Sequence, residues 1–140
     1  MFKKIIFVCV LSFFIFFLLP VNSFAQEKID LHMFYGQGCP HCAKLEMFLD
    51  EIAEKYPQLN IQKHEIYHDN ENRELFQKMA EQYNTTIGGV PTVFINNSVI
   101  VGFSNTIATD IENQIKECLD LGCNDQAVIQ NIDETGVIPQ

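Results

Sequence analysis

Residues 34–43 read Phe-Tyr-Gly-Gln-Gly-Cys-Pro-His-Cys-Ala, and this stretch decides the fold. Cys39 and Cys42 are separated by two residues and follow a loop that contains two glycines. The segment before the loop, 28–35, alternates apolar and polar residues, which predicts a strand. Behind the cysteines, apolar residues recur at helical spacing until Pro57. We therefore predict a helix that begins at the cysteine pair.

This placement gives the two cysteines different chemistry. The thiolate is the reactive form of cysteine, and the positive end of a helix favours a negative sulfur at Cys39 and lowers its pKa. His41 can add positive charge or a hydrogen-bond donor, and Pro40 has a backbone angle that suits the first helical turn. We predict that Cys39 attacks a disulfide and that Cys42 resolves the mixed disulfide. The candidate catalytic residues are Cys39, Pro40, His41 and Cys42.

A second interpretation of the same spacing is half of a zinc site. Zinc would need two further ligands, and the candidates are Cys118 with Cys123 or His64 with His68. Nothing in the positions of these residues converges on Cys39. We therefore favour redox exchange without a metal or an organic cofactor. The alternative is a binding module that is not catalytic, or a protein that binds metal through its cysteine pair.

The rest of the chain predicts an α/β fold in which strands and helices alternate and a hairpin precedes a last helix. The order βαβαββα indicates a central mixed four-stranded sheet flanked by three helices. Asn-Asn suits the tight turn of the hairpin. The elements predicted after the first helix are a strand at 61–67, a helix that begins at Asp69 or Asn70, strands at 92–95 and 98–101, and a helix from about 107 to Gly122.

Residues 34–43, together with Gly89-Val90-Pro91-Thr92-Val93-Phe94, resemble the thioredoxin superfamily. The resemblance extends over residues 28–121 and implies the thioredoxin fold. It also implies that Pro91 is the cis proline of the superfamily, with the backbone of Val90 facing the disulfide and pairing with a substrate chain. From the residues alone, an ordinary trans proline that opens an edge strand is the alternative.

Within this superfamily the Pro-His dipeptide is similar to that of DsbA, whereas the compact layout is similar to glutaredoxin. The sequence departs from glutaredoxin at Gly89 and at 101–103, which argues against glutathione as a partner. From thioredoxin it departs at Met33, where a buried aspartate is usual. Oxidase, isomerase and reductase activities all stay open at this point.

The first residues of the chain have the features of an export signal. A basic start, an apolar run and the small residues Ser23 and Ala25 divide the chain into a signal peptide at 1–25, a thioredoxin-like domain at 26–123 and a C-terminal tail at 124–140. An uncleaved membrane anchor is the alternative to cleavage. We predict an extracytoplasmic protein, periplasmic or secreted.

Of the five cysteines, Cys9 lies in the predicted signal. Cys118 and Cys123 flank the predicted helix end at Gly122, where side chains on either side of the end commonly touch. A structural disulfide between them is geometrically reasonable. The alternative is a second redox pair that relays electrons to Cys39 and Cys42.

The net charge limits the classes of partner that this protein can bind. The formal net charge of −9 argues against nucleic acid, because binding to phosphates needs clustered lysine and arginine. We predict a monomer that acts on protein thiols or disulfides, with a membrane redox protein as a further partner. His32, His64 and His68 lie on or beside predicted strands, and we interpret them as surface or strand-edge residues without a catalytic role.

Overall fold

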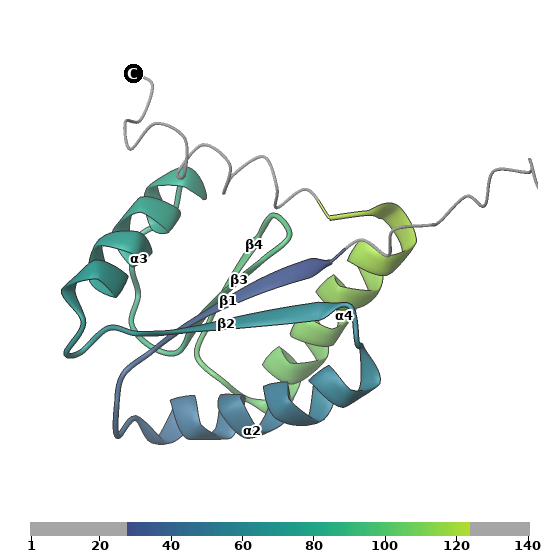
Figure 1. Ribbon diagram of the computed structural model, residues 1–140, viewed down its shortest axis with the longest axis horizontal. Helices are drawn as coiled ribbons and strands as arrows, with labels where there is room; N and C mark the ends of the chain where they lie inside the picture. The colour runs from purple at the N-terminus through teal and green to yellow at the C-terminus, as the bar shows by residue number, and fades with distance from the viewer. Residues whose placement is uncertain (1–27, 124–140) are drawn as a thin grey trace, which may run out of the picture.

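The computed structural model describes residues 28–123, and in this range strands and helices follow the predicted order βαβαββα (Figure 1). The predicted signal and tail, at 1–25 and 124–140, lie outside the described residues. The elements are β1 (Ile29–Tyr35), α2 (Pro40–Lys55), β2 (Leu59–Glu65), α3 (Asn70–Gln82), β3 (Thr92–Ile95), β4 (Ser98–Val101) and α4 (Asn105–Leu121).

The four strands form one mixed sheet in the order β2-β1-β3-β4. β1 runs parallel to β2, with Tyr35 opposite Glu65, and antiparallel to β3, with Phe34 opposite Thr92. β4 returns antiparallel to β3. The prediction of a thioredoxin fold with a mixed four-stranded sheet and three helices is confirmed. Because of these directions, β1, β2 and β4 end, and β3 begins, at the same end of the sheet.

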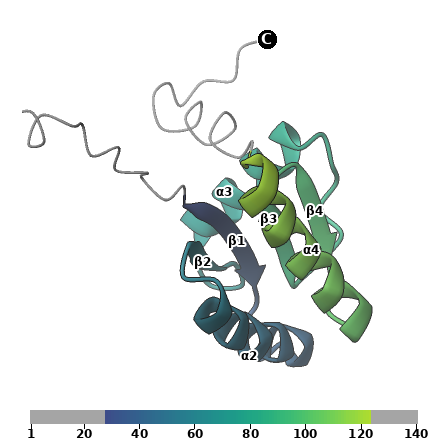
Figure 2. The same ribbon diagram turned by 90° about the vertical axis from the view of Figure 1, so that its right-hand side faces the viewer.

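Alternation along β1 supplies two separate cores. Leu31 and Met33 pack against buried residues of α2 and α4, such as Leu49 and Ile115. Phe34 points to the other face and packs against buried residues of α3 and against Phe94 of β3. The helices are distributed accordingly, with α2 and α4 on one side of the sheet and α3 on the other (Figure 1, Figure 2). Burial of apolar side chains on both faces is the main force that holds the layers together.

Each helix begins at a side chain that accepts a hydrogen bond from the first turn. Asp69 accepts from the backbone of Asn72 at 3.0 Å and caps α3. Ser104, which the sequence interpretation did not single out, accepts from the backbone of Ile107 at 3.3 Å and caps α4. Such caps satisfy amide groups that the helix itself leaves unpaired.

Strand β2 corrects the predicted boundaries. It spans Leu59–Glu65 rather than 61–67, so it begins and ends two residues early. The end has a clear physical cause, because the Glu65 carboxylate accepts hydrogen bonds from the backbone of Tyr67 at 2.8 Å and of His68 at 2.9 Å. The Ile66 N–H still donates to the carbonyl of Tyr35 at 2.9 Å, and the bonds to Glu65 turn the chain away from the sheet after Ile66.

Candidate functional site

Cys39 is the residue that caps α2, and its sulfur accepts a hydrogen bond from the backbone N–H of Cys42 at 3.2 Å. Pro40 is the first residue of the helix. Cys39 and Cys42 form a disulfide with their Cα atoms 5.2 Å apart. The predicted helix start therefore lies under the first cysteine, where unpaired N–H groups favour negative charge.

The two sulfurs differ in exposure. Cys42 is 3 % exposed and belongs to the core between the sheet, α2 and α4. Cys39 is half-buried, and Pro40 and His41 beside it are exposed. Only the Cys39 side of the disulfide is open to another molecule. This asymmetry suits an attacking and a resolving cysteine.

The second motif lies against the first. The Val90–Pro91 peptide bond is cis, and the carbonyl oxygen of Val90 lies 4.0 Å from the Cys39 sulfur. The loop is held on both sides of this bond, because the Thr92 hydroxyl donates to the carbonyl of Gly89 at 2.7 Å and the Gly102 N–H donates to the carbonyl of Pro91 at 2.7 Å. Residues about fifty positions apart thus form one redox site at the end of the sheet where β1 ends and β3 begins.

The turn before Cys39 is also well defined. The Cys39 N–H donates to the carbonyl of Gly36 at 3.1 Å, and Gly38 has a φ of 81°, which a residue without a Cβ adopts readily. The Gln37 N–H, inside this turn, donates to the Glu65 carboxylate at 3.2 Å. Sequence reasoning missed Glu65, because an acidic residue at a strand end looks like ordinary solvated surface.

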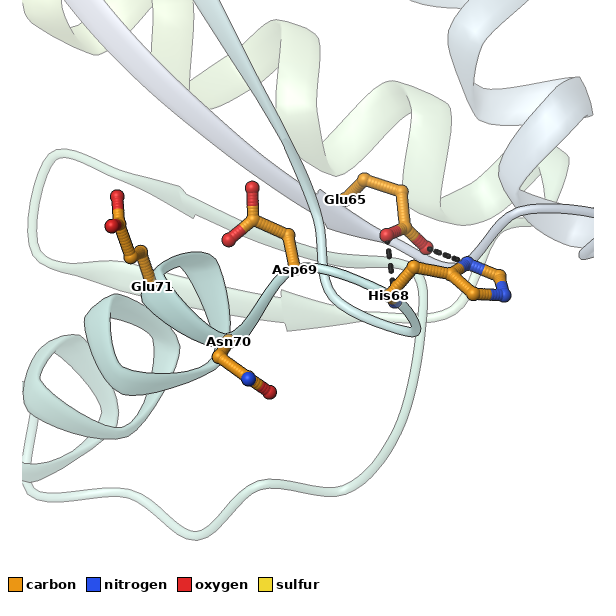
Figure 3. A pocket seen from close by; sticks show the side chains of 5 residues that line it. All are labelled: Glu65, His68, Asp69, Asn70 and Glu71. Atoms are coloured by element: carbon orange, nitrogen blue, oxygen red, sulfur yellow. Dashed lines mark hydrogen bonds and ion pairs between the residues drawn. The ribbon is translucent and has the colours of Figure 1, made fainter.

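Glu65 lines an open hollow with His68, Asp69, Asn70 and Glu71, all from the β2–α3 turn and the start of α3 (Figure 3). Desolvation opposes ionisation of Glu65, but the backbone N–H groups of His68, Tyr67 and Gln37 outweigh it and lower its pKa to about 2. Glu65 is therefore a carboxylate at neutral pH, held by three backbone donors.

His32 corrects the sequence interpretation, which placed it at the surface or at a strand edge. It is 6 % exposed on the central strand β1, and its Nδ1 lies 3.0 Å from Nε2 of His64. The two rings are stacked, with centroids 5.3 Å apart. Burial, followed by the neighbouring His64, lowers the pKa of His32 to about 4, against the opposing effect of Asp30. His64 is half-buried on the edge strand, and His68 is exposed.

Cys118 and Cys123 form a second disulfide, with Cα atoms 4.5 Å apart. Between them Gly122 has a φ of 84° and ends α4, and its N–H donates to the carbonyl of Cys118 at 2.9 Å. In both views the end of α4, where this disulfide lies, is far from the start of α2 (Figure 1, Figure 2). Within residues 28–123, no group of three or more His, Cys, Asp or Glu side chains is arranged to hold a metal ion.

A cysteine pair at the start of a helix, set against a cis-proline loop on a mixed βαβαββα sheet, places the chain in the thioredoxin superfamily. The glutaredoxin family matches residues 29–100, just over half of the sequence. The chain belongs to this family. A search of curated proteins gives no significant match.

Solved structures agree on the fold. A protein from Chlorobium tepidum described as thiol:disulfide interchange protein DsbE superposes with a TM-score of 0.52 at 15 % identity, over 67 % of this chain and 82 % of that one. A protein from Agrobacterium tumefaciens gives 0.51 at 16 % identity, over 65 % and 46 %. Glutaredoxin 1 from Francisella tularensis gives 0.43 at 21 % identity, over 64 % and 98 %. The likeness in fold rests on the first two.

Proposed function

We propose that this protein is an exported thiol-disulfide oxidoreductase that exchanges disulfides with protein cysteines through Cys39 and Cys42. One observation carries the proposal: the accessible sulfur of the pair caps a helix and accepts the backbone N–H of Cys42 at 3.2 Å. In the reduced protein the same N–H and helix end favour a thiolate at Cys39. A thiolate at neutral pH is the nucleophile that exchange requires.

The exchange balances without any further reagent. As a reductant, the Cys39 thiolate attacks one sulfur of a substrate disulfide, forms a mixed disulfide and releases the other substrate sulfur as a thiolate, which takes up a proton. The Cys42 thiol loses its proton and attacks the Cys39 sulfur, which closes the Cys39–Cys42 disulfide and releases the second substrate thiol. Two electrons pass to the substrate. Run in reverse, the same steps oxidise a pair of substrate thiols.

The loop at Val90 supports a polypeptide as substrate. Its carbonyl lies beside the Cys39 sulfur, so an extended chain whose cysteine reacts there can pair with the backbone of this loop. Gly89 and residues 101–103 differ from the glutaredoxin pattern near glutathione. We therefore propose protein cysteines as the substrate.

The location belongs to the proposal as well. The apolar N-terminal stretch and the small residues Ser23 and Ala25 support export to an oxidising compartment, where a membrane redox protein could exchange electrons with the cysteine pair. In the part of the chain from 28 to 123, no helix is both long and apolar enough to span a membrane. Expression with the full leader tests export: the exported protein should begin at Gln26. A chain that keeps Met1 and stays in the membrane would contradict cleavage.

Turnover is tested by reduction of insulin disulfides with dithiothreitol as electron donor. We expect catalysis by the wild type and none by Cys39→Ser. Cys42→Ser should instead accumulate a mixed disulfide with the substrate, visible on a gel without reductant. A double variant, Cys118→Ala with Cys123→Ala, is the control and should keep turnover. Catalysis by Cys39→Ser would exclude the proposed mechanism.

The direction of exchange follows from the reduction potential of the Cys39–Cys42 pair. A potential of about −120 mV would make the protein an oxidant, and one of about −270 mV would make it a reductant, as for proteins of known potential. Equilibration with glutathione or dithiothreitol buffers, followed by mass spectrometry of the Cys39 peptide, gives this number.

A further inference from the structure

The turn that presents Cys39 is held from outside the redox motif. Its own closing hydrogen bond runs from the Cys39 N–H to the carbonyl of Gly36 at 3.1 Å. A second bond fixes its interior, where the Gln37 N–H donates to Oε1 of Glu65 at 3.2 Å. Glu65 is the last residue of β2, which pairs with β1 opposite Tyr35. The side chain therefore reaches from the end of one strand to the loop that follows the other.

Glu65 is itself firmly placed. Its Oε1 also accepts from the Tyr67 N–H at 2.8 Å, and its Oε2 accepts from the His68 N–H at 2.9 Å. The carbonyl of Glu65 accepts from the side-chain amide of Asn72 at 3.0 Å. A carboxylate has acceptor sites on both oxygens and so can satisfy three converging N–H groups, whereas a glutamine offers one oxygen and turns an N–H₂ toward the rest.

Helix α3 anchors the same segment. The Arg73 guanidinium donates to the carbonyls of Ile66 at 2.8 Å and Tyr67 at 2.9 Å. The Tyr67 ring lies against Gly36, where an added Cβ would overlap the ring. The β2–α3 turn thus contacts the Gly36–Cys39 turn twice, once through the Glu65 carboxylate and once through an aromatic ring.

We propose that Glu65 is a positioning residue for Cys39: its carboxylate holds the turn that places the Cys39 sulfur over the first turn of α2. The inference rests on the proposed function, since it concerns the reactivity of the attacking cysteine. A positioning role and a purely electrostatic role of the Glu65 carboxylate change the pKa of Cys39 in opposite directions. A carboxylate close to a thiolate repels it, so removal of the charge alone makes Cys39 easier to ionise. Loss of the hydrogen bond from Gln37 to Glu65 lets the sulfur move away from the Cys42 N–H, which makes Cys39 harder to ionise.

The test measures the rate at which iodoacetamide alkylates Cys39 as a function of pH, in full-length chains that carry Cys42→Ser. The Cys39 peptide is followed by mass spectrometry, so other thiols do not contribute. Three substitutions are compared in this background: Glu65→Ala, Glu65→Gln and Glu71→Gln. Glu71 lines the same hollow and contacts no part of the turn before Cys39, so it is the matched control for charge (Figure 3).

Below the thiol pKa we expect Glu65→Ala to slow alkylation by about threefold to tenfold, the range that loss of one hydrogen bond of ordinary strength implies. Glu65→Gln should slow it less, and Glu71→Gln should leave it unchanged or slightly faster. At high pH, where Cys39 is fully ionised, all rates should converge. A general loss of stability does not shift this profile in a protein that is still folded, which circular dichroism verifies.

The proposal is overturned if both Glu65 variants alkylate as fast as Glu71→Gln or faster. If Glu65→Ala does not fold, Glu65→Gln decides between the same two outcomes, because it keeps one acceptor oxygen. Failure of this inference differs from failure of the proposed function. Absence of insulin reduction by the wild type would end the function, whereas identical pH profiles in an active protein would end only the role of Glu65.

Discussion

The stacked pair of buried His32 and half-buried His64 should make the protein lose stability between neutral and mildly acidic pH. In the folded protein burial, followed by the neighbouring His64, lowers the pKa of His32 from 6.5 to about 4, against the opposing effect of Asp30. Its Nε2 is buried and finds no hydrogen-bond partner among residues 28–123, so a proton there would have no acceptor. The pKa of His64 is also lowered, mainly by burial and against Asn72 and Asp69.

The direction in which stability changes with pH follows from the number of protons that the folded and the unfolded state bind. Above pH 6.5 His32 is neutral in both the folded and the unfolded chain, and the stability that depends on its neutral form is fully present. As the pH falls from 6.5 toward 4, only the unfolded chain binds the proton, so the free energy of unfolding decreases. The difference between 6.5 and about 4 corresponds to about 3 kcal/mol for His32 at the lower end of this window. Carboxylates with lowered pKa, Glu65 and Glu112, act in a separate window, from 4.5 toward 2.

Urea unfolding at pH 7, 6, 5 and 4.5 measures the effect, with His32→Leu as the perturbation and His68→Leu as the matched control. His68 has an exposed side chain, 71 % accessible, so its replacement should leave the wild-type slope nearly intact. His32→Leu has no buried group to protonate at this position, and its stability should fall much less over the same range. Equal slopes for wild type and His32→Leu would refute the reasoning, whatever the absolute stabilities.

Three further outcomes are expected. Replacing Cys118 and Cys123 together by alanine should lower the free energy of unfolding by about 2 kcal/mol, because the closed loop is short, and should leave insulin turnover in place. Gly36→Ala should destabilise the fold by about 1–3 kcal/mol in urea through the overlap with Tyr67, and Tyr67→Ala in the same chain should recover much of the loss. Glu112→Gln should cost up to about 1 kcal/mol, since its ion pairs are partly exposed, and should flatten the loss of stability below pH 4.5.

The fold was predictable because its signals are local. Residues 34–43 contain a strand end, a glycine turn and a helix start within ten positions, and the helix cap needs no partner from elsewhere in the chain. The same holds for Gly122 between two cysteines. The cis bond before Pro91 came from the resemblance, because a proline before a strand suits a trans bond equally well from the residues alone.

The histidine pair and the contact of Glu65 with Gln37, which the sequence did not predict, depend on which residues the sheet places side by side. His32 and His64 lie in neighbouring strands, and only the register, in which Phe34 is opposite His64, brings them to one face. Glu65 meets Gln37 for the same reason, since β1 and β2 end together. Hydrophobic periodicity assigns a residue to a strand or helix, but it contains no information on the partner strand or on the direction in which that strand runs.

The two disulfides lie at different places in the fold because of where α4 begins and ends. The segment before α4 touches the redox site, where the Gly102 N–H donates to the carbonyl of Pro91 at 2.7 Å. Cys118 lies in the last turn of a helix of 17 residues, which at about 1.5 Å per residue spans roughly 25 Å. Both views place that end of α4 far from the start of α2 (Figure 1, Figure 2). Disulfide exchange requires sulfur to attack sulfur directly, so we expect no relay of electrons from the second pair to Cys39 within one folded molecule. It instead closes the end of α4, where Cys118 is packed in the core beneath.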